Sequence, residues 1–273
     1  MSGPLVAVVV ASTADVPIRP RWLERLVEEA GDRAEVWLVG AIPGRVVSPF
    51  RGLARPSTRL VPELWRDGLD ASTSPLVAFT TTSMLPEPGW LDALIGAIDG
   101  GASAAGGPIV ADAGLSTIDM AIYLHRFGRY AAATDAIDPP GDNALYRRDA
   151  LAPHARLWAD GFWETRIHAA IRAAGGRFAT ARGAGVAYLG GGRFGPFLRR
   201  RLAHARIFGG EAGGWPMLSA MAVAPAVAAR LTLRAARSAG GFRASRIRSL
   251  PALGLIGSTW ALGEALGRSR QSA

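Results

Sequence analysis

The stretch Phe79–Leu91 (FTTTSMLPEPGWL) decides how this chain is expected to fold. It begins where an apolar run, Pro75–Phe79, ends, and short runs of this kind are typical of strands buried on both faces. The polar residues Thr81–Ser83 come next. A Pro-Gly pair then precedes apolar residues at helical spacing, which predict a helix over Trp90–Asp99. This order of strand, polar segment and helix predicts one repeat of an α/β sheet.

The residues before this stretch repeat the same alternation. Apolar runs predict strands over Leu5–Ala11 (LVAVVVA) and Ala34–Val39 (AEVWLV), and helical spacing predicts helices over Arg21–Ala30 and Val61–Ala71. Residues 41–60 are rich in Gly, Pro and Arg and predict a loop. The alternation favours an α/β fold with an open, mostly parallel sheet flanked by helices.

The second half of the chain alternates less regularly. The sequence predicts a strand over Ala104–Ile109, an amphipathic helix over 115–130, a helix from about Gly161 to Ala174 and a short strand over Val186–Leu189.

Small residues follow three of the predicted strands at their carboxyl ends. Ser12 and Thr13 follow the first strand, Gly40 follows the second, and Thr81 and Ser83 follow the third. Because ligands bind at the carboxyl ends of strands in open parallel sheets, we expect a binding site at this edge.

Composition excludes several kinds of chemistry. The chain has no cysteine, which excludes disulfides and thiolate sites, and all 31 of its basic residues are arginine, which excludes a phosphate-loop lysine and Schiff bases. No basic segment precedes the first apolar run, so we expect no secretory signal and a cytoplasmic protein.

The positive charge lies almost entirely in the last third of the chain. Residues 1–192 hold 18 Arg and 20 Asp or Glu, whereas residues 193–273 hold 13 Arg and 2 Glu, a net charge of +11. Uncharged runs over 212–229 and 249–263, with Trp215 and Trp260, favour helices that lie on an anionic membrane surface. A helical hairpin packed on the rest of the protein is the alternative, and nucleic acid is not an expected partner.

Five segments, taken in order, resemble family-2 glycosyltransferases, which have a GT-A fold. They are Val10–Thr13, Phe79–Leu91, Gly141–Arg148 (GDNALYRR), Gly161–Thr165 (GFWET) and Phe197–Gly209 (FLRRRLAHARIFG). The resemblance implies a GT-A-like domain over residues 1–210 and an arginine-rich, apolar helical extension over residues 211–273.

The resemblance also implies an activity. It implies inverting transfer of a sugar from a UDP- or GDP-linked donor to a lipid-linked or polysaccharide acceptor, by an enzyme attached peripherally to the inner face of the cell membrane. Glu164 would be the general base. The donor would be bound by Ser12, Thr13, Gly40, Arg66, Thr81 and Ser83, and the acceptor or diphosphate by Asn143, Arg147, Trp163, Arg201, His204 and Arg206.

The chain departs from the family pattern at its acidic positions. The metal-binding acidic triplet (DxD) is replaced by Thr81-Thr82-Ser83, and the aspartate after the second strand by Gly40. Hydroxyl groups are weak ligands for divalent cations, so these residues do not support the family's metal. Two hypotheses follow: an enzyme whose arginines stabilise the diphosphate, or a catalytically inactive binding or scaffold protein in a membrane glycan-assembly complex.

Several candidate residues also have ordinary structural interpretations. Glu164 could be an acid that stabilises a helix N-terminus, and Trp163 could belong to the core. Asn143 could hold a turn. His168, four residues after Glu164, is expected to be a partly exposed helix residue rather than a metal ligand.

Overall fold

The computed structural model describes residues 5–42, 48–131, 138–211 and 244–269, together with 226, 229, 230 and 233. The contacts divide the chain into two compact units, one made of residues 1–110 and 132–189 and the other of residues 111–131 and 190–273. The expected domain boundary at residue 210 stays a prediction of the resemblance, and most of residues 211–243 lie outside the described part.

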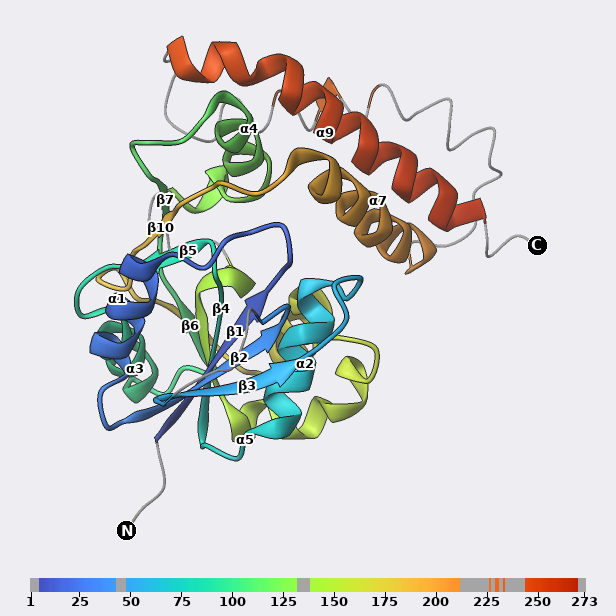
Figure 1. Ribbon diagram of the computed structural model, residues 1–273. Helices are drawn as coiled ribbons and strands as arrows, with labels where there is room; N and C mark the ends of the chain where they lie inside the picture. The colour runs from blue at the N-terminus through green and yellow to red at the C-terminus, as the bar shows by residue number, and fades with distance from the viewer. Residues whose placement is uncertain are drawn as a thin grey trace. The chain divides into compact units, whose positions relative to one another are not determined.

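The first unit is built on a seven-stranded sheet (Figure 1). The strands β3, β2, β1 and β4 run parallel in that order, β8 is antiparallel to both β4 and β6, and β6 is parallel to β9. The prediction of a mostly parallel α/β sheet is confirmed. The bounds are β3 Phe50–Ala54, β2 Ala34–Gly40, β1 Val6–Ser12, β4 Leu76–Thr81, β8 Ala144–Arg147, β6 Ala104–Gly106 and β9 Phe178–Thr180.

Helices cover both faces of this sheet (Figure 1). The helices α1 and α3 contact one another, while α2 and α6 share the hydrophobic core on the opposite face. Their bounds are α1 Pro20–Ala30, α2 Val61–Ala71, α3 Trp90–Asp99 and α6 Glu164–Ala173, with short helical turns at η2 Gly141–Asn143, α5 Arg148–Leu151 and η3 Ala152–Trp158. The helices expected at 21–30, 61–71 and 90–99 are therefore confirmed, and the helix expected from about 161 to 174 is found over Glu164–Ala173.

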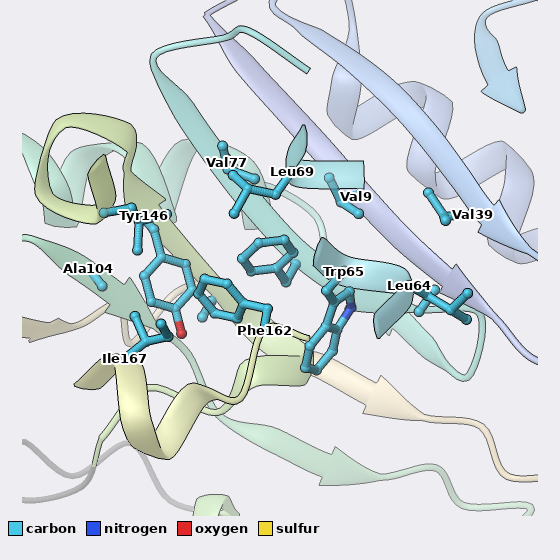
Figure 2. Close-up of a cluster of buried hydrophobic side chains, with 14 of the residues drawn as sticks. Val9, Val39, Leu64, Trp65, Leu69, Val77, Ala104, Tyr146, Phe162 and Ile167 are labelled. Atoms are coloured by element: carbon cyan, nitrogen blue, oxygen red, sulfur yellow. The ribbon is translucent and has the colours of Figure 1, made fainter. Parts of the chain in front are cut away.

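An aromatic cluster ties the central strands to α2 and α6. Phe79 of β4 lies 5.7 Å from Trp65, 5.6 Å from Tyr146 and 4.5 Å from Phe162, measured between ring centroids. Figure 2 shows Trp65, Phe162 and Tyr146 side by side in this core, with Ile167 of α6 beside them. Phe79, the first residue of the stretch Phe79–Leu91, thus lies at the centre of the core.

Three short strands depart from the sequence prediction. Phe50–Ala54 was expected to be loop but forms β3, an edge strand whose exposed residues show no apolar run. Ala104–Ile109 was expected to be one strand but is divided between β6 and β7 (Ile109–Ala111), which belong to different sheets. β7 joins β5 (Met84–Pro86) and β10 (Val186–Tyr188) in a second, three-stranded sheet.

The second unit is helical. It contains α4 (Thr117–Arg126), η1 (Gly128–Tyr130), α7 (Phe194–Glu211) and α9 (Ala244–Ser269). The helix α9 packs on both α7 and α4. Within the described ranges, no helix has the length and hydropathy needed to cross a bilayer.

Candidate functional site

Three predicted site residues lie in one row across the parallel strands. Ser12 of β1 pairs with Gly40 of β2, and Ala11, next to Ser12, pairs with Thr81 of β4. The expected meeting of the strand ends is therefore found. Ser12, Thr13, Thr81 and Ser83 all have buried side chains at this edge.

The conformation of Gly40 leaves no room for a side chain. Its φ is +122°, and a methyl group on its Cα would lie 2.2 Å from the carbonyl oxygen of Ser12. Two hydrogen bonds hold the strands this close: the Ala41 amide donates to the Ser12 carbonyl (2.9 Å), and Ser12 Oγ donates to the Ala41 carbonyl (2.6 Å). Only glycine fits this position, so the acidic side chain of the family pattern is excluded by the backbone itself.

The Thr81–Ser83 segment is a poor divalent-metal site. Thr81 Oγ1 and Ser83 Oγ lie 2.8 Å apart and share a hydrogen bond, and the two side chains are only 6% and 7% exposed. The described residues contain no group of three or more histidines and carboxylates arranged to hold a metal ion. The donor set does not fit the metal that the resemblance implies.

Glu164 reaches the same edge from a distant part of the chain. A methyl group on Gly141 would lie 3.2 Å from the Glu164 carboxyl carbon and 2.9 Å from the ring of Trp65. Trp65 Nε1 in turn donates to the Thr80 carbonyl at the end of β4 (2.9 Å). The carboxyl group therefore lies beside Gly141, which also contacts Trp65, and Trp65 in turn bonds the end of β4 at Thr80.

The loop before α6 fixes where Glu164 begins its helix. The Phe162 amide donates to the Pro62 carbonyl at the start of α2 (2.8 Å), and the Phe162 side chain is fully buried. Gly161, with φ +144°, lets the chain pass close to α2. Glu164 is the first residue of α6, where the helix dipole favours its negative charge.

The side chains of Asn143 and Trp163 lie in the interior of the protein. Asn143 has no exposed surface: its Oδ1 accepts from Trp90 Nε1 (2.7 Å), and its Nδ2 donates to the carbonyls of Pro108 (3.2 Å) and Ala184 (2.8 Å). Trp163 is 1% exposed. Both side chains are buried, and their roles as acceptor or diphosphate contacts stay predictions.

Arg147 lies at the wrong end of the sheet. The strand β8 is antiparallel to β4, and Arg147 pairs with Leu76, five residues before Thr81. Because each residue of a strand spans about 3.3 Å, Arg147 lies about 16 Å along the sheet from Thr81. Arg147 also forms a bidentate pair with Asp149. Its assignment to the diphosphate was wrong, because sequence alone did not show that β8 reverses direction.

Two arginines meet the buried carboxylate of Asp67 in α2. Arg66 Nε donates to Asp67 Oδ1 (2.6 Å), and Arg55 Nε donates to Asp67 Oδ2 (2.5 Å). Burial raises the pKa of Asp67, but the hydrogen bonds from both arginines outweigh it, and the net pKa is lowered. Arg55 was not predicted from the sequence; it follows the edge strand β3, and its amide donates to the Gly40 carbonyl. The sequence contains no stronger indication of Arg55 than its position directly after Phe50–Ala54, which has no apolar pattern typical of a strand.

His168 is buried, contrary to the expectation of a partly exposed residue. Its Nε2 lies 2.7 Å from the Tyr146 hydroxyl, and its Nδ1 lies 3.7 Å from Asp138. The imidazole of His168, followed by Arg172, holds the pKa of Asp138 below its usual value. The side chain therefore holds α6 to β8 and is not paired with Glu164 as a metal ligand.

The remaining candidates, on α7, belong to the second unit. The Arg201 guanidinium lies 4.1 Å from the ring centroid of Trp260, and its Nη2 lies 3.3 Å from His125 Nε2. The His204 ring stacks on Phe208 at 5.2 Å. Burial, followed by the charges of Arg201 and Arg126, holds the pKa values of His125 and His204 well below the usual value. Roles for Arg201, His204 and Arg206 at the diphosphate stay predictions.

No protein-family model matches the sequence, and no curated protein matches it significantly. Among solved structures, the chain is similar to the mannosyltransferase PcManGT from Pyrobaculum calidifontis in complex with GDP-Man and Mn²⁺, with 17% identity over 96% of this chain and 73% of that one, at a TM-score of 0.47. It is also similar to residues 1–349 of S. aureus TarS (10% identity, 73% and 64% covered, TM-score 0.44). A third structure, the homologue of Mycobacterium tuberculosis rv0371c from Mycobacterium sp. strain JC1, shares 11% identity over 65% of this chain and 85% of that one, with a TM-score of 0.40. These partial likenesses assign the chain to no family.

Proposed function

We propose that the protein is an inverting glycosyltransferase that uses a nucleotide-sugar donor. The observation that carries this proposal is the position of Glu164, whose carboxyl group stands beside Gly141 and Trp65 at the carboxyl edge of the parallel strands. A carboxylate at the edge of the sheet where ligands bind suits proton abstraction from a bound alcohol.

The proposed reaction is a single displacement. The Glu164 carboxylate accepts the proton of an acceptor hydroxyl while the acceptor oxygen forms a bond to the anomeric carbon of the sugar. The bond from that carbon to the diphosphate oxygen breaks, and the nucleoside diphosphate leaves with the electron pair. In this proposal Arg55 and Arg66, together with the hydroxyl groups of Thr81 and Ser83, stabilise the negative charge of the leaving diphosphate.

The donor and the acceptor are proposed by chemical class. The donor is a UDP- or GDP-linked sugar, and the acceptor is a lipid-linked or polysaccharide glycan at the cytoplasmic face of the membrane. The net charge of +11 in residues 193–273 supports attachment to an anionic membrane surface.

The test is nucleoside diphosphate release from UDP- and GDP-sugars, combined with calorimetric titration of the same donors with and without Mn²⁺. Glu164→Gln is expected to lower kcat by about 100-fold or more while donor affinity is kept, because the amide cannot accept the proton. The matched control is Asp160→Asn, which changes an exposed carboxylate four residues away, paired with Arg166. Full activity of Glu164→Gln would rule out this base.

A binding protein without activity is the second candidate. The hydrogen bond between the Thr81 and Ser83 hydroxyl groups favours this candidate. A hydroxyl group that already forms a hydrogen bond with its neighbour is less available to bind a diphosphate. Such a protein could scaffold a membrane glycan-assembly complex. Donor binding without product release would support this candidate, and turnover that Glu164→Gln abolishes would exclude it.

A further inference from the structure

One helix of the second unit is apolar on both of its sides. The buried side of α9 packs on α7 and α4 through residues such as Leu253, Ile256 and Ala261. On the other side, Ile247, Leu255 and Leu262 are 52%, 49% and 42% exposed. Residues 249–263 carry no charge, so this part of the exposed side lacks the charged residues that normally face water.

The exposed residues form one continuous stripe. Ile247, Pro251, Leu255, Ser258 and Leu262 are all exposed and recur at spacings of four, four, three and four residues, which places them on one face of a helix. At 1.5 Å per residue the stripe is about 22 Å long. A surface helix with a stripe of this kind indicates a partner that is itself apolar.

The surrounding charge identifies the partner. Arg248 is exposed in the first turns of α9 beside Ile247, and the sequence places Arg243 and Arg246 just before it. Residues 193–273, which include α9, contain 13 arginines and 2 glutamates. An apolar stripe with a basic start matches the boundary of an anionic bilayer, where acyl chains and phosphate groups lie next to each other.

We propose that the Ile247–Leu262 stripe of α9 inserts into the interface of an anionic bilayer and attaches the protein to it. This inference rests on the proposed function, for which it names the attachment surface. Trp260, expected from sequence to be an interfacial anchor, is not part of this surface. Its ring packs on Arg201 and His204, and its Nε1 donates to Glu264 (2.9 Å).

The test is co-sedimentation of the full chain with vesicles of phosphatidylglycerol and phosphatidylcholine, compared with vesicles of phosphatidylcholine alone. Leu255→Glu is expected to weaken binding to the anionic vesicles by about tenfold or more, because an apolar contact becomes a charge in the interface. Leu255→Trp is expected to strengthen it, since tryptophan favours the interface. The opposite directions separate the surface effect from any loss of folding.

Leu157→Glu is the matched control, since Leu157 is 37% exposed in the first unit and undergoes the same change. Equal vesicle binding by Leu255→Glu and Leu157→Glu would overturn the proposal. So would a wild-type dimer that Leu255→Glu dissociates while vesicle binding is kept, because the stripe would then join two copies of the chain. Donor binding by calorimetry without vesicles tests the proposed function separately, and the Leu255 variants should keep it.

Discussion

At the residue scale, the candidate site depends on two glycines that leave room for other groups. Gly40 lets β2 approach Ser12, and Gly141 leaves space for the Glu164 carboxyl group and the Trp65 ring. Asn143, two residues after Gly141, holds Trp90 and two carbonyl groups. Asn143, a predicted ligand contact, therefore has a structural role, and Gly40 and Gly141 shape the candidate site.

Gly40→Ala is expected to lower the free energy of unfolding by about 2–4 kcal/mol, because the new methyl group would meet the Ser12 carbonyl and alanine disfavours a positive φ. Urea unfolding measures this. The control is Gly96→Ala in α3, where an added methyl group has no neighbour within 4 Å. That change is expected to stabilise by up to about 1 kcal/mol. Similar unfolding midpoints for the two variants would contradict the close contact at Gly40.

At the element scale, helix ends and helix contacts rest on groups from distant segments. Both carboxylate oxygens of Glu29, at the end of α1, accept amide hydrogens at the start of α3, from Gly89 (2.9 Å) and Leu91 (3.1 Å). This caps the helix that begins at the Pro-Gly-Trp-Leu motif. Trp90 is buried in the same place and bonds Asn143. The Pro-Gly-Trp-Leu motif therefore has a structural role in packing and helix capping, whether or not it also contacts a ligand.

The helices α7 and α9 approach each other through glycines. Gly267→Val is expected to separate them, because even a methyl group on Gly267 would lie 2.1 Å from the Arg206 carbonyl oxygen. Hydrogen exchange should rise in α7 and α9 and stay unchanged in β1 and β4 of the first unit. Gly254→Ala is the control in the same helix, since an added methyl group there has no neighbour within 4 Å. Unchanged exchange in Gly267→Val would show that this contact is not needed.

At the scale of the whole molecule, the two units differ in the titratable groups whose pKa values are lowered. The second unit holds His125 and His204, and the first holds Asp67 and Asp138; all four have pKa values lowered by folding. A lowered pKa in the folded state means that the unfolded state binds protons first as the pH falls. Each group therefore stabilises its unit above the unfolded pKa, and this stability is lost on acidification.

The two units are expected to lose stability in different pH ranges. The second unit should weaken as the pH falls below the ordinary histidine value of 6.5, whereas Asp67 and Asp138 affect the first unit only below about the ordinary aspartate value of 3.8. Hydrogen exchange, corrected for the intrinsic effect of pH, should show α7 and α9 losing protection before β1 and β4. His125→Gln should reduce the early loss. Simultaneous loss in both units would contradict this assignment.

The amino-acid sequence alone determined the alternation of strands and helices, the bounds of α2 and α3, and the meeting of Ser12, Gly40 and Thr81 at one edge. These follow from apolar periodicity and from the geometry of parallel strands, both of which are local. Only the tertiary structure decided that β3 is a strand, that β8 runs antiparallel and carries Arg147 away from the site, and that Asn143, Trp163 and His168 point inward. The reason is physical: strand direction and side-chain burial depend on contacts between residues far apart in the chain, as between Glu164 and Gly141, and no local pattern records such contacts.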